Sequence, residues 1–442
     1  MNPLTIFLYE WKHLSRSPFK LVAMVLFIIA AIYALHSGAA LYKKQDAAIE
    51  QIREKADEER QRYLSYYDKG EKGPEDRPWI DMSTPFWAVW NSPTYHFKTP
   101  SPAMVYSIGQ AEQYGFYKRV TYGSSPYDAD MAEEIANPER LQSGTLDFSF
   151  VVLYLLPLLL LICLYNIKGA EADAGFLPLV FTQTGSQNSW LLARVTFYGL
   201  LILLILLGLM LYGAGLTSVF PGSGSAFLHM FFWLFGYLLL WGIVYALILQ
   251  KGMSSISNTL KMVGVWLLFA FIIPATVHQW VSIQHPSNLM TEWIDAQREE
   301  SNQLYDQADS VIQAQLNALF PDIVNSPVAL AGTNTRFARN RSIAALSNEL
   351  VKKSVAKIES SNEARNDLIR FSYWFNPVTF MQNKLNDLSQ THYQDYQSYR
   401  TDIQSMVDMQ IQILVLDLWN DVEVDKKRYL QYQEMMGQAS EK

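Results

Sequence analysis

Long stretches of apolar residues alternate with strongly charged stretches along the chain. Five stretches contain no Asp, Glu, Lys or Arg: residues 21–42, 148–165, 195–216, 227–249 and 262–281. A helix needs about 20 apolar residues to cross a bilayer, and each stretch is close to or above that length. One such stretch would also suit a buried helix of a soluble domain, but five in one chain favour an integral membrane protein. We therefore expect an α-helical polytopic membrane protein with five transmembrane helices.

The polar stretches define the remaining organisation. They are a short amphipathic segment, a first large region, a segment between the second and third spans, a short turn and a second large region, at residues 1–20, 43–147, 166–194, 250–261 and 282–442. The first large region begins with good helix formers that continue the first membrane helix, and then becomes rich in Pro and aromatic residues. We expect it to be a mixed α/β domain. The second large region reads as three helical stretches and is expected to be mainly helical.

In that second region, the first helix is expected to begin at Ser287, after Pro286, and the second to end before Pro377. The third helical stretch is expected to run from His392 almost to the end of the chain. One face of it carries mostly apolar side chains at helical spacing, namely Tyr399, Ile403, Met406, Ile411, Leu414 and Leu418. That face is predicted to be buried.

Basic residues gather at particular ends of the spans. They flank the N-terminal segment, the 166–194 segment and the 250–261 turn, as Lys12, Arg16, Lys20, Lys168, Arg194, Lys251 and Lys261. Lys43 and Lys44 oppose this trend, but acidic residues follow them at once. The positive-inside rule places these segments in the cytoplasm together with the N-terminus. Both large polar regions are then expected outside.

Charge and motifs exclude several classes of function. The formal net charge of −7 argues against nucleic acid as a partner. Cys163 is the only cysteine, so no disulfide forms within the chain. The sequence lacks a P-loop, an HExxH zinc motif and a GxSxG nucleophile elbow. We expect a protein that is not an enzyme, with no catalytic residues, no cofactor of its own and no metal site.

The segment from Asn166 to Ser186 is the strongest candidate for a functional site. Gly169 and Gly175 permit sharp turns, and a short helix is expected to start at Asp173 or Ala174. Pro178 is tolerated only in the first turn of that helix. The residues that follow are too apolar for a free loop, namely Phe176, Leu177, Leu179, Val180 and Phe181. They are expected to contact either the membrane surface or a partner protein.

Several stretches together resemble the permease subunit of type-2 ABC transporters. The branch in question has large extracytoplasmic insertions after the first and fifth spans. FLYEWKHLSRSPFKL resembles its elbow helix, with Glu10, Arg16 and Ser17 at matching places. EADAGFLPLVFTQTGSQNSWLLAR resembles its cytoplasmic coupling segment, in which Glu171, Gly175 and Arg194 match. Residues 137–166 resemble the entry to span two, and NPVTFMQNKLNDLSQTHYQDYQSYR resembles the outer domain before the last span.

The resemblance implies a site that couples the chain to an ATPase. Its residues would be Glu171, Asp173, Gly175, Phe176, Leu177, Leu179, Val180 and Phe181. Phe176 departs from the family, which often has Thr at that place. Cytoplasmic ABC ATPase subunits would bind ATP and Mg²⁺, and a second permease, identical or related, would complete the complex. The implied location is the bacterial inner membrane.

The family has six spans, whereas nothing after Val281 is long and apolar enough for another. We expect that a terminal sixth span is missing from this chain.

Three functions remain open at this point. The first is an ATP-driven export-type permease subunit. The second is an ABC-type complex that transmits motion to an extracytoplasmic partner, such as a lipoprotein, a cell-wall enzyme or an adhesion machine, and transports nothing. The third is a membrane receptor or scaffold, which would explain large polar regions but not five spans. The apolar spans suit a lipid-like cargo and ordinary helix packing equally, so the sequence indicates no substrate.

Overall fold

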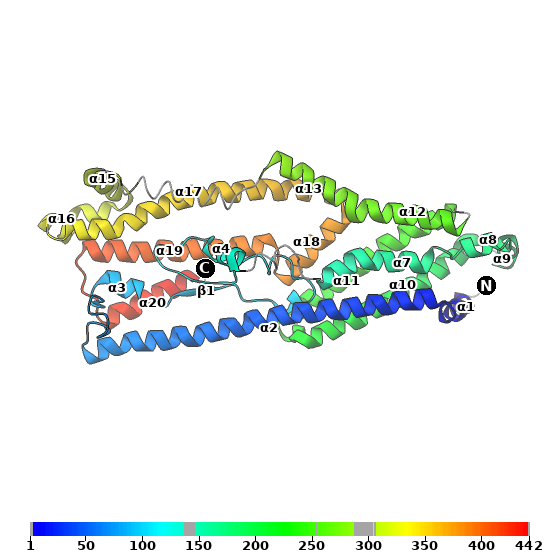
Figure 1. Ribbon diagram of the computed structural model, residues 1–442, viewed down its shortest axis with the longest axis horizontal. Coiled ribbons are helices and arrows are strands. Elements are labelled where there is room, and N and C mark those ends of the chain that lie inside the picture. The colour runs from blue at the N-terminus through cyan, green and yellow to red at the C-terminus, as the bar shows by residue number, and fades with distance from the viewer. Residues whose placement is uncertain are drawn as a thin grey trace.

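The computed structural model describes residues 3–136, 146–184, 186–252, 254–286, 304 and 306–440. The molecule is elongated and mostly helical (Figure 1). Within this described part, five helices are long and apolar enough to cross a membrane, namely Pro18–Lys69, Phe148–Asp173, Gln187–Thr217, Val219–Lys251 and Ser255–Gln284. They confirm the prediction of a multi-pass helical membrane protein. We call their end of the molecule the membrane half and the other end the polar half.

The membrane half contains the following elements in chain order: α1 (Pro3–Ser15), the first part of α2 (Pro18–Lys69), α6 (Phe148–Phe150), the π-helical turn η2 (Val151–Leu155), α7 (Leu156–Leu164), α8 (Gly169–Asp173), α9 (Leu177–Thr184), α10 (Gln187–Thr217), α11 (Val219–Lys251), α12 (Ser255–Leu267), the π-helical turn η3 (Leu268–Ile272) and α13 (Ile273–Gln284).

The polar half contains the rest of α2 and these elements: α3 (Pro85–Trp90), β1 (Tyr95–Phe97), η1 (Pro102–Val105), β2 (Tyr117–Arg119), α4 (Asp128–Ala136), α15 (Asp309–Leu319), η4 (Pro321–Asn325), α16 (Pro327–Ala331), α17 (Thr335–Phe371), η5 (Ser372–Trp374), α18 (Pro377–Ser389), α19 (Tyr393–Trp419) and α20 (Lys426–Ser440). Strands β1 and β2 pair antiparallel, with Tyr95 opposite Arg119 and Phe97 opposite Tyr117.

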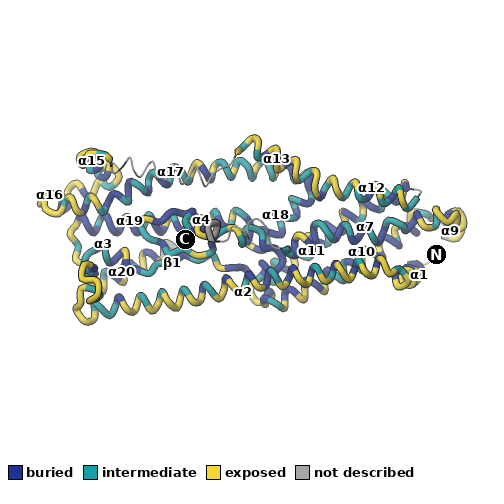
Figure 2. The backbone as a smooth tube through the Cα atoms, in the orientation of Figure 1, coloured by how far each residue is buried: buried dark blue, intermediate teal, exposed yellow. Residues whose placement is uncertain are grey.

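Helix α2 runs without interruption from the membrane half into the polar half (Figure 1). Pro18 lies in its first turn, where a missing N–H costs nothing, and Gly70 ends it in the left-handed conformation with φ 70°. The prediction that charged residues continue the first membrane helix is confirmed. Figure 2 shows exposed positions recurring along the polar part of α2, as expected for a helix with one face in solvent.

A proline explains the π-helical turn η2. Pro157 has no N–H, so it leaves the carbonyl of Leu153, four residues earlier, without its usual helical donor. Tyr237 of α11 donates its hydroxyl to this carbonyl at 2.7 Å, and Trp266 of α12 donates its indole N–H to the carbonyl of Tyr154 at 3.0 Å. Because lipid offers no hydrogen bonds, such side chains from neighbouring helices hold the second span in place.

Helix α19 is the centre of the polar half and packs against α3, α17 and α20. Its predicted apolar face is confirmed as buried, with Ile403 and Met406 fully inaccessible to solvent. The expected single helix from residue 392 onward is wrong, because α19 ends at Trp419. Asp421 adopts a positive φ of 50°, and the N–H of Val424 bonds to the carbonyl of Ser83 instead of continuing the helix.

The other expectations for the polar regions have mixed outcomes. Helix α17 ends before Pro377, as predicted. The expected start of the preceding helix at Ser287 lies outside the described residues. In the first region the described residues contain one two-stranded sheet among short helices and loops.

Helix α18 connects the two halves. Its residues Val378, Met381 and Leu385 belong to the hydrophobic core of the membrane half. Phe380 contacts Trp233 of α11 with ring centroids 5.4 Å apart, and Gln382 donates to Ser149 Oγ of α6 at 3.0 Å.

Candidate functional site

Helices α1, α8 and α9 lie together at the far end of the membrane half (Figure 1). This end contains the segment that the sequence singles out, residues 166–194. The expected start of a helix at Asp173 or Ala174 is wrong: α8 ends at Asp173 and α9 begins at Leu177. Gly175 lies between them with φ 76°, a conformation that a helix cannot include. Pro178 is in the first turn of α9, as its missing N–H requires.

An ion cluster joins the elbow segment to the 166–194 segment. Arg194 Nε lies 2.5 Å from Glu10 Oε1, and Arg194 Nη1 lies 2.5 Å from Glu171 Oε1. The side chains of Arg194 and Glu10 are each 6% exposed. The guanidinium also donates to the carbonyl of Ile167 and lies over the ring of Trp190. Two predicted site residues, Glu10 and Glu171, are therefore brought together by Arg194, which the resemblance matched to the family but which was not among the predicted site residues.

Two of the lysines used to orient the chain are also buried, contrary to the picture of residues at a membrane surface. Lys20 donates to the carbonyl of Cys163 at 2.7 Å and to the hydroxyl of Tyr198 at 3.2 Å. Lys168 donates to the carbonyl of Gln250 at 2.8 Å. A lysine at the end of a span has the same sequence signature whether it faces headgroups or pairs with a helix end, so the pattern alone does not separate the two roles.

The remaining predicted elbow residues stay outside the ion cluster. Arg16 is exposed, and Ser17 directly precedes α2 without a capping hydrogen bond from its side chain.

Helix α8 is attached to the ends of two membrane helices. Asp173 accepts the N–H of Ser255, in the first turn of α12, at 3.2 Å. A negative charge at a helix N-terminus is favourable, because the free N–H groups there point toward it. Lys168, next to α8, makes the corresponding contact with the C-terminal end of α11. Together with Arg194 on α10, these contacts join the α8–α9 segment to three membrane helices.

Gly169→Ala is expected to loosen this attachment. A Cβ atom at Gly169 would lie 2.5 Å from the backbone nitrogen of Ser255, closer than atoms can approach. We expect α8 to shift away from α12 and the unfolding free energy to fall by about 1–3 kcal/mol, a usual cost of overpacking. Denaturation in detergent measures this, with Gly199→Ala as the matched control, because nothing lies within 4 Å of its added Cβ. Equal stability of the two variants would contradict the close packing.

The apolar residues of α9 and the turn before it divide between two sides. Leu177 is buried, while Val180 and Phe181 pack against the core of the membrane half. In contrast, Phe176 is 62% exposed and Leu179 is 57% exposed. The predicted stretch is therefore fixed on one side and presents large apolar side chains on the other.

A cavity of about 620 Å³ lies between α1 and α9. The ion cluster lines it together with Tyr9, Lys12 and Arg16. Glu171 Oε2 is buried and accepts no hydrogen bond from any described residue, whereas Glu10 also accepts from the hydroxyl of Tyr198. Such carboxylate oxygens can accept donors from a basic or hydroxylated side chain. No group of His, Cys, Asp or Glu suited to a metal ion occurs among the described residues.

Comparison with known proteins identifies no relative: no protein-family model, no curated protein and no solved structure matches this chain.

Proposed function

We propose that this chain is the membrane-spanning, non-catalytic subunit of an ATP-driven ABC complex. In this proposal, a cytoplasmic ATPase binds the exposed side of α9. One observation carries the proposal: Phe176 and Leu179 are exposed, while the rest of the α8–α9 segment is joined to membrane helices. An exposed apolar pair on such a fixed element suits contact with a partner.

The contacts of the segment provide routes for motion. A displacement of α9 by the ATPase would reach α10 through Arg194 and α12 through Asp173. Glu171, which lines the cavity and is 24% exposed, would accept a basic side chain of the partner. ATP and Mg²⁺ would bind to the ATPase alone, and a second permease, identical or related, would complete the complex. Conformational switching requires an element with two arrangements, which the α8–α9 segment supplies in this proposal.

A second candidate function is transmission without transport. The continuity of α2 favours it, because a single helix connects the membrane half to the polar half. In this case the moving helices would act on a protein bound to the polar half outside the cell. The site for the ATPase would be the same in both functions.

The double variant Phe176→Asp, Leu179→Asp tests the docking site. We expect the wild-type chain, purified from its native bacterial membrane in mild detergent, to carry an ATPase with a P-loop. The variant should retain at least tenfold less of it, because two carboxylates would be buried in an apolar contact. Mass spectrometry and ATP hydrolysis of the purified sample measure the loss. Leu330→Asp is the control, since Leu330 is 75% exposed but lies in the polar half.

Two outcomes would contradict the proposal. If the wild-type chain carries no ATPase, the coupling function fails. A fluorophore placed on α9 reports contact with lipid, because brominated lipids quench its fluorescence. If the double variant retains the ATPase but loses this quenching, α9 lies on lipid instead of on the ATPase.

A further inference from the structure

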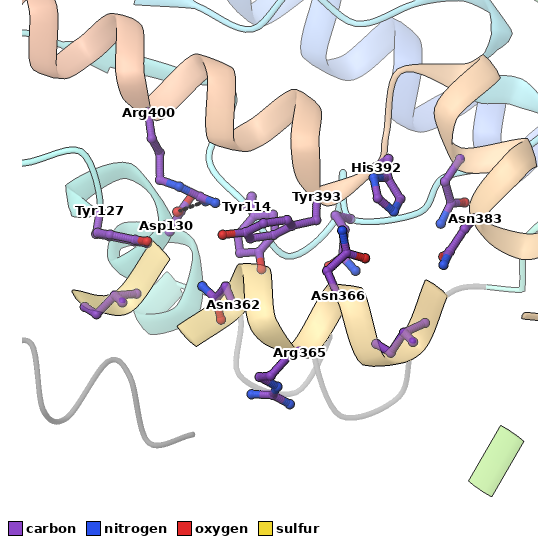
Figure 3. A pocket seen from close by; sticks show the side chains of 14 residues that line it. Tyr114, Tyr127, Asp130, Asn362, Arg365, Asn366, Asn383, His392, Tyr393 and Arg400 are labelled. Atoms are coloured by element: carbon purple, nitrogen blue, oxygen red, sulfur yellow. Dashed lines mark hydrogen bonds and ion pairs between the residues drawn. The ribbon is translucent and has the colours of Figure 1, made fainter. Parts of the chain in front are cut away.

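The polar half contains a second cavity, of about 430 Å³, which the proposed coupling does not use. Residues of α4, α17, α18 and α19 line it, together with the loop that contains Tyr114 (Figure 3). Its volume is within the range of about 300–1,000 Å³ that is typical of sites for small molecules. Side-chain amides are frequent in its walls, namely Gln110, Asn362, Asn366, Asn383 and Asn386.

The charges in the lining favour an anionic ligand. Asp130 is paired with Arg400 at 3.0 Å, so this carboxylate is neutralised. Burial lowers the pKa of His392, which keeps that ring uncharged at neutral pH. Arg365 belongs to the cavity lining and has no ion pair with any described residue, and Figure 3 shows its side chain turned away from Tyr114 and Arg400. A carboxylate of a ligand would give Arg365 a partner, whereas a cation would find no free carboxylate among the described lining residues.

The amide groups favour a ligand that contains peptide bonds. Asn362 and Asn366 lie one helical turn apart on α17, a rise of about 6 Å. An extended peptide repeats every two residues at about 6.8 Å, and each carboxamide can donate to one peptide group and accept from another. Asn386 is 6% exposed; its Oδ1 accepts from Ser107, while its Nδ2 donates to no described residue. That donor is available to a ligand.

We propose that this cavity binds a short peptide through its free carboxyl terminus. Arg365 pairs with the carboxylate, and the amides of α17 and α18 bond to the peptide groups. Tyr114, Tyr127 and Tyr393 supply the aromatic part of the wall. The inference depends on the polar half alone and does not require the proposed ATPase.

The ligand would contact an element that also touches the membrane helices. Asn383 and Asn386 line the cavity from α18, whose Phe380 and Gln382 contact α11 and α6. Peptide binding would therefore act on α18, the helix that connects the two halves.

Equilibrium dialysis of the full chain in detergent tests the proposal. Three probes are used: a library of random tripeptides with free carboxyl ends, the same library with amidated ends, and chitobiose. We expect the free-acid peptides to be retained at least tenfold better than the amidated ones. Arg365→Gln should abolish this preference, and Asn366→Leu should weaken peptide retention about tenfold. Arg370→Gln is the matched control, because Arg370 is on the same helix, exposed and outside the cavity lining.

Three results would overturn the proposal. The first is that the wild-type chain retains no tripeptide. The second is that it retains free-acid and amidated tripeptides equally, and the third is that it retains chitobiose alone. An unchanged acid preference in Arg365→Gln, with folding confirmed by thermal denaturation, would also remove Arg365 from the site. None of these results depends on whether an ATPase is bound, so the outcome is independent of the docking experiment.

Discussion

Replacing Arg194 by leucine is expected to lower the free energy of unfolding by about 3–5 kcal/mol, the usual cost of removing one partner from a buried ion pair. Arg194 lies between the carboxylates of Glu10 and Glu171, and both pairs are 2.5 Å apart. Without the guanidinium, two negative charges would face each other in a region of low dielectric constant. Denaturation of the purified chain in detergent measures the change.

A triple variant separates lost pairing from lost packing. Adding Glu10→Gln and Glu171→Gln to Arg194→Leu should recover part of the stability that Arg194→Leu alone loses, because the uncompensated charges are then absent. Arg16→Leu is the control, since Arg16 lines the same cavity but is exposed. A loss in Arg194→Leu no greater than in Arg16→Leu would show that the ion cluster is not buried as the structure has it.

Replacing Arg400 by leucine is expected to destabilise the polar half by a similar amount. Arg400 pairs with Asp130 at 3.0 Å and with Glu359 at 3.2 Å, and its side chain is 3% exposed. The hydroxyls of Tyr127 and Tyr393 also donate to Glu359. Among the described residues, the variant would therefore leave the buried Asp130 with only the backbone N–H of Gly115, and the partly buried Glu359 with only hydroxyl donors; neither carboxylate would have a cation. Arg336→Leu, outside these contacts on α17, serves as the control.

The loss of stability in Arg400→Leu is expected to depend on pH. Burial raises the pKa of Asp130 to about 6, above the usual value near 4. Between these values the folded state binds more protons than the unfolded state, so this carboxyl reduces stability as the pH rises from about 4 to 6. Loss of the cation raises the pKa of Asp130 further, which extends the effect to higher pH. The difference in unfolding free energy between Arg400→Leu and the wild type should be largest near pH 8 and shrink toward pH 5. A difference that stays constant with pH would contradict this.

Sequence patterns predicted the helices and helix faces that depend on residues close together in the sequence. The uncharged stretches predicted the five long apolar helices, and the helix-forming residues after Tyr42 predicted the continuation of α2. The spacing of apolar residues predicted the buried face of α19. Its end at Trp419 was missed, because that end depends on a bond between Val424 and Ser83, which are remote in sequence.

The candidate sites were predicted only in part for the same reason. The apolar stretch after Gly175 identified the segment that lies at the end of the membrane half. Its division into fixed and exposed sides depends on the core that Leu177 contacts, which no local pattern describes. The second cavity combines residues near positions 110, 130, 362, 386 and 400, so only the tertiary structure brings them together.

The length of α2 has a mechanical consequence. Its 52 residues correspond to about 78 Å of rigid helix, at about 1.5 Å per residue. If the helix pivots at its membrane end, a tilt of about 5° moves its other end by roughly 7 Å over that length. A small rearrangement near Lys20 would thus become a displacement larger than the pitch of a helix at Gly70, with the single helix acting as a lever between the two halves.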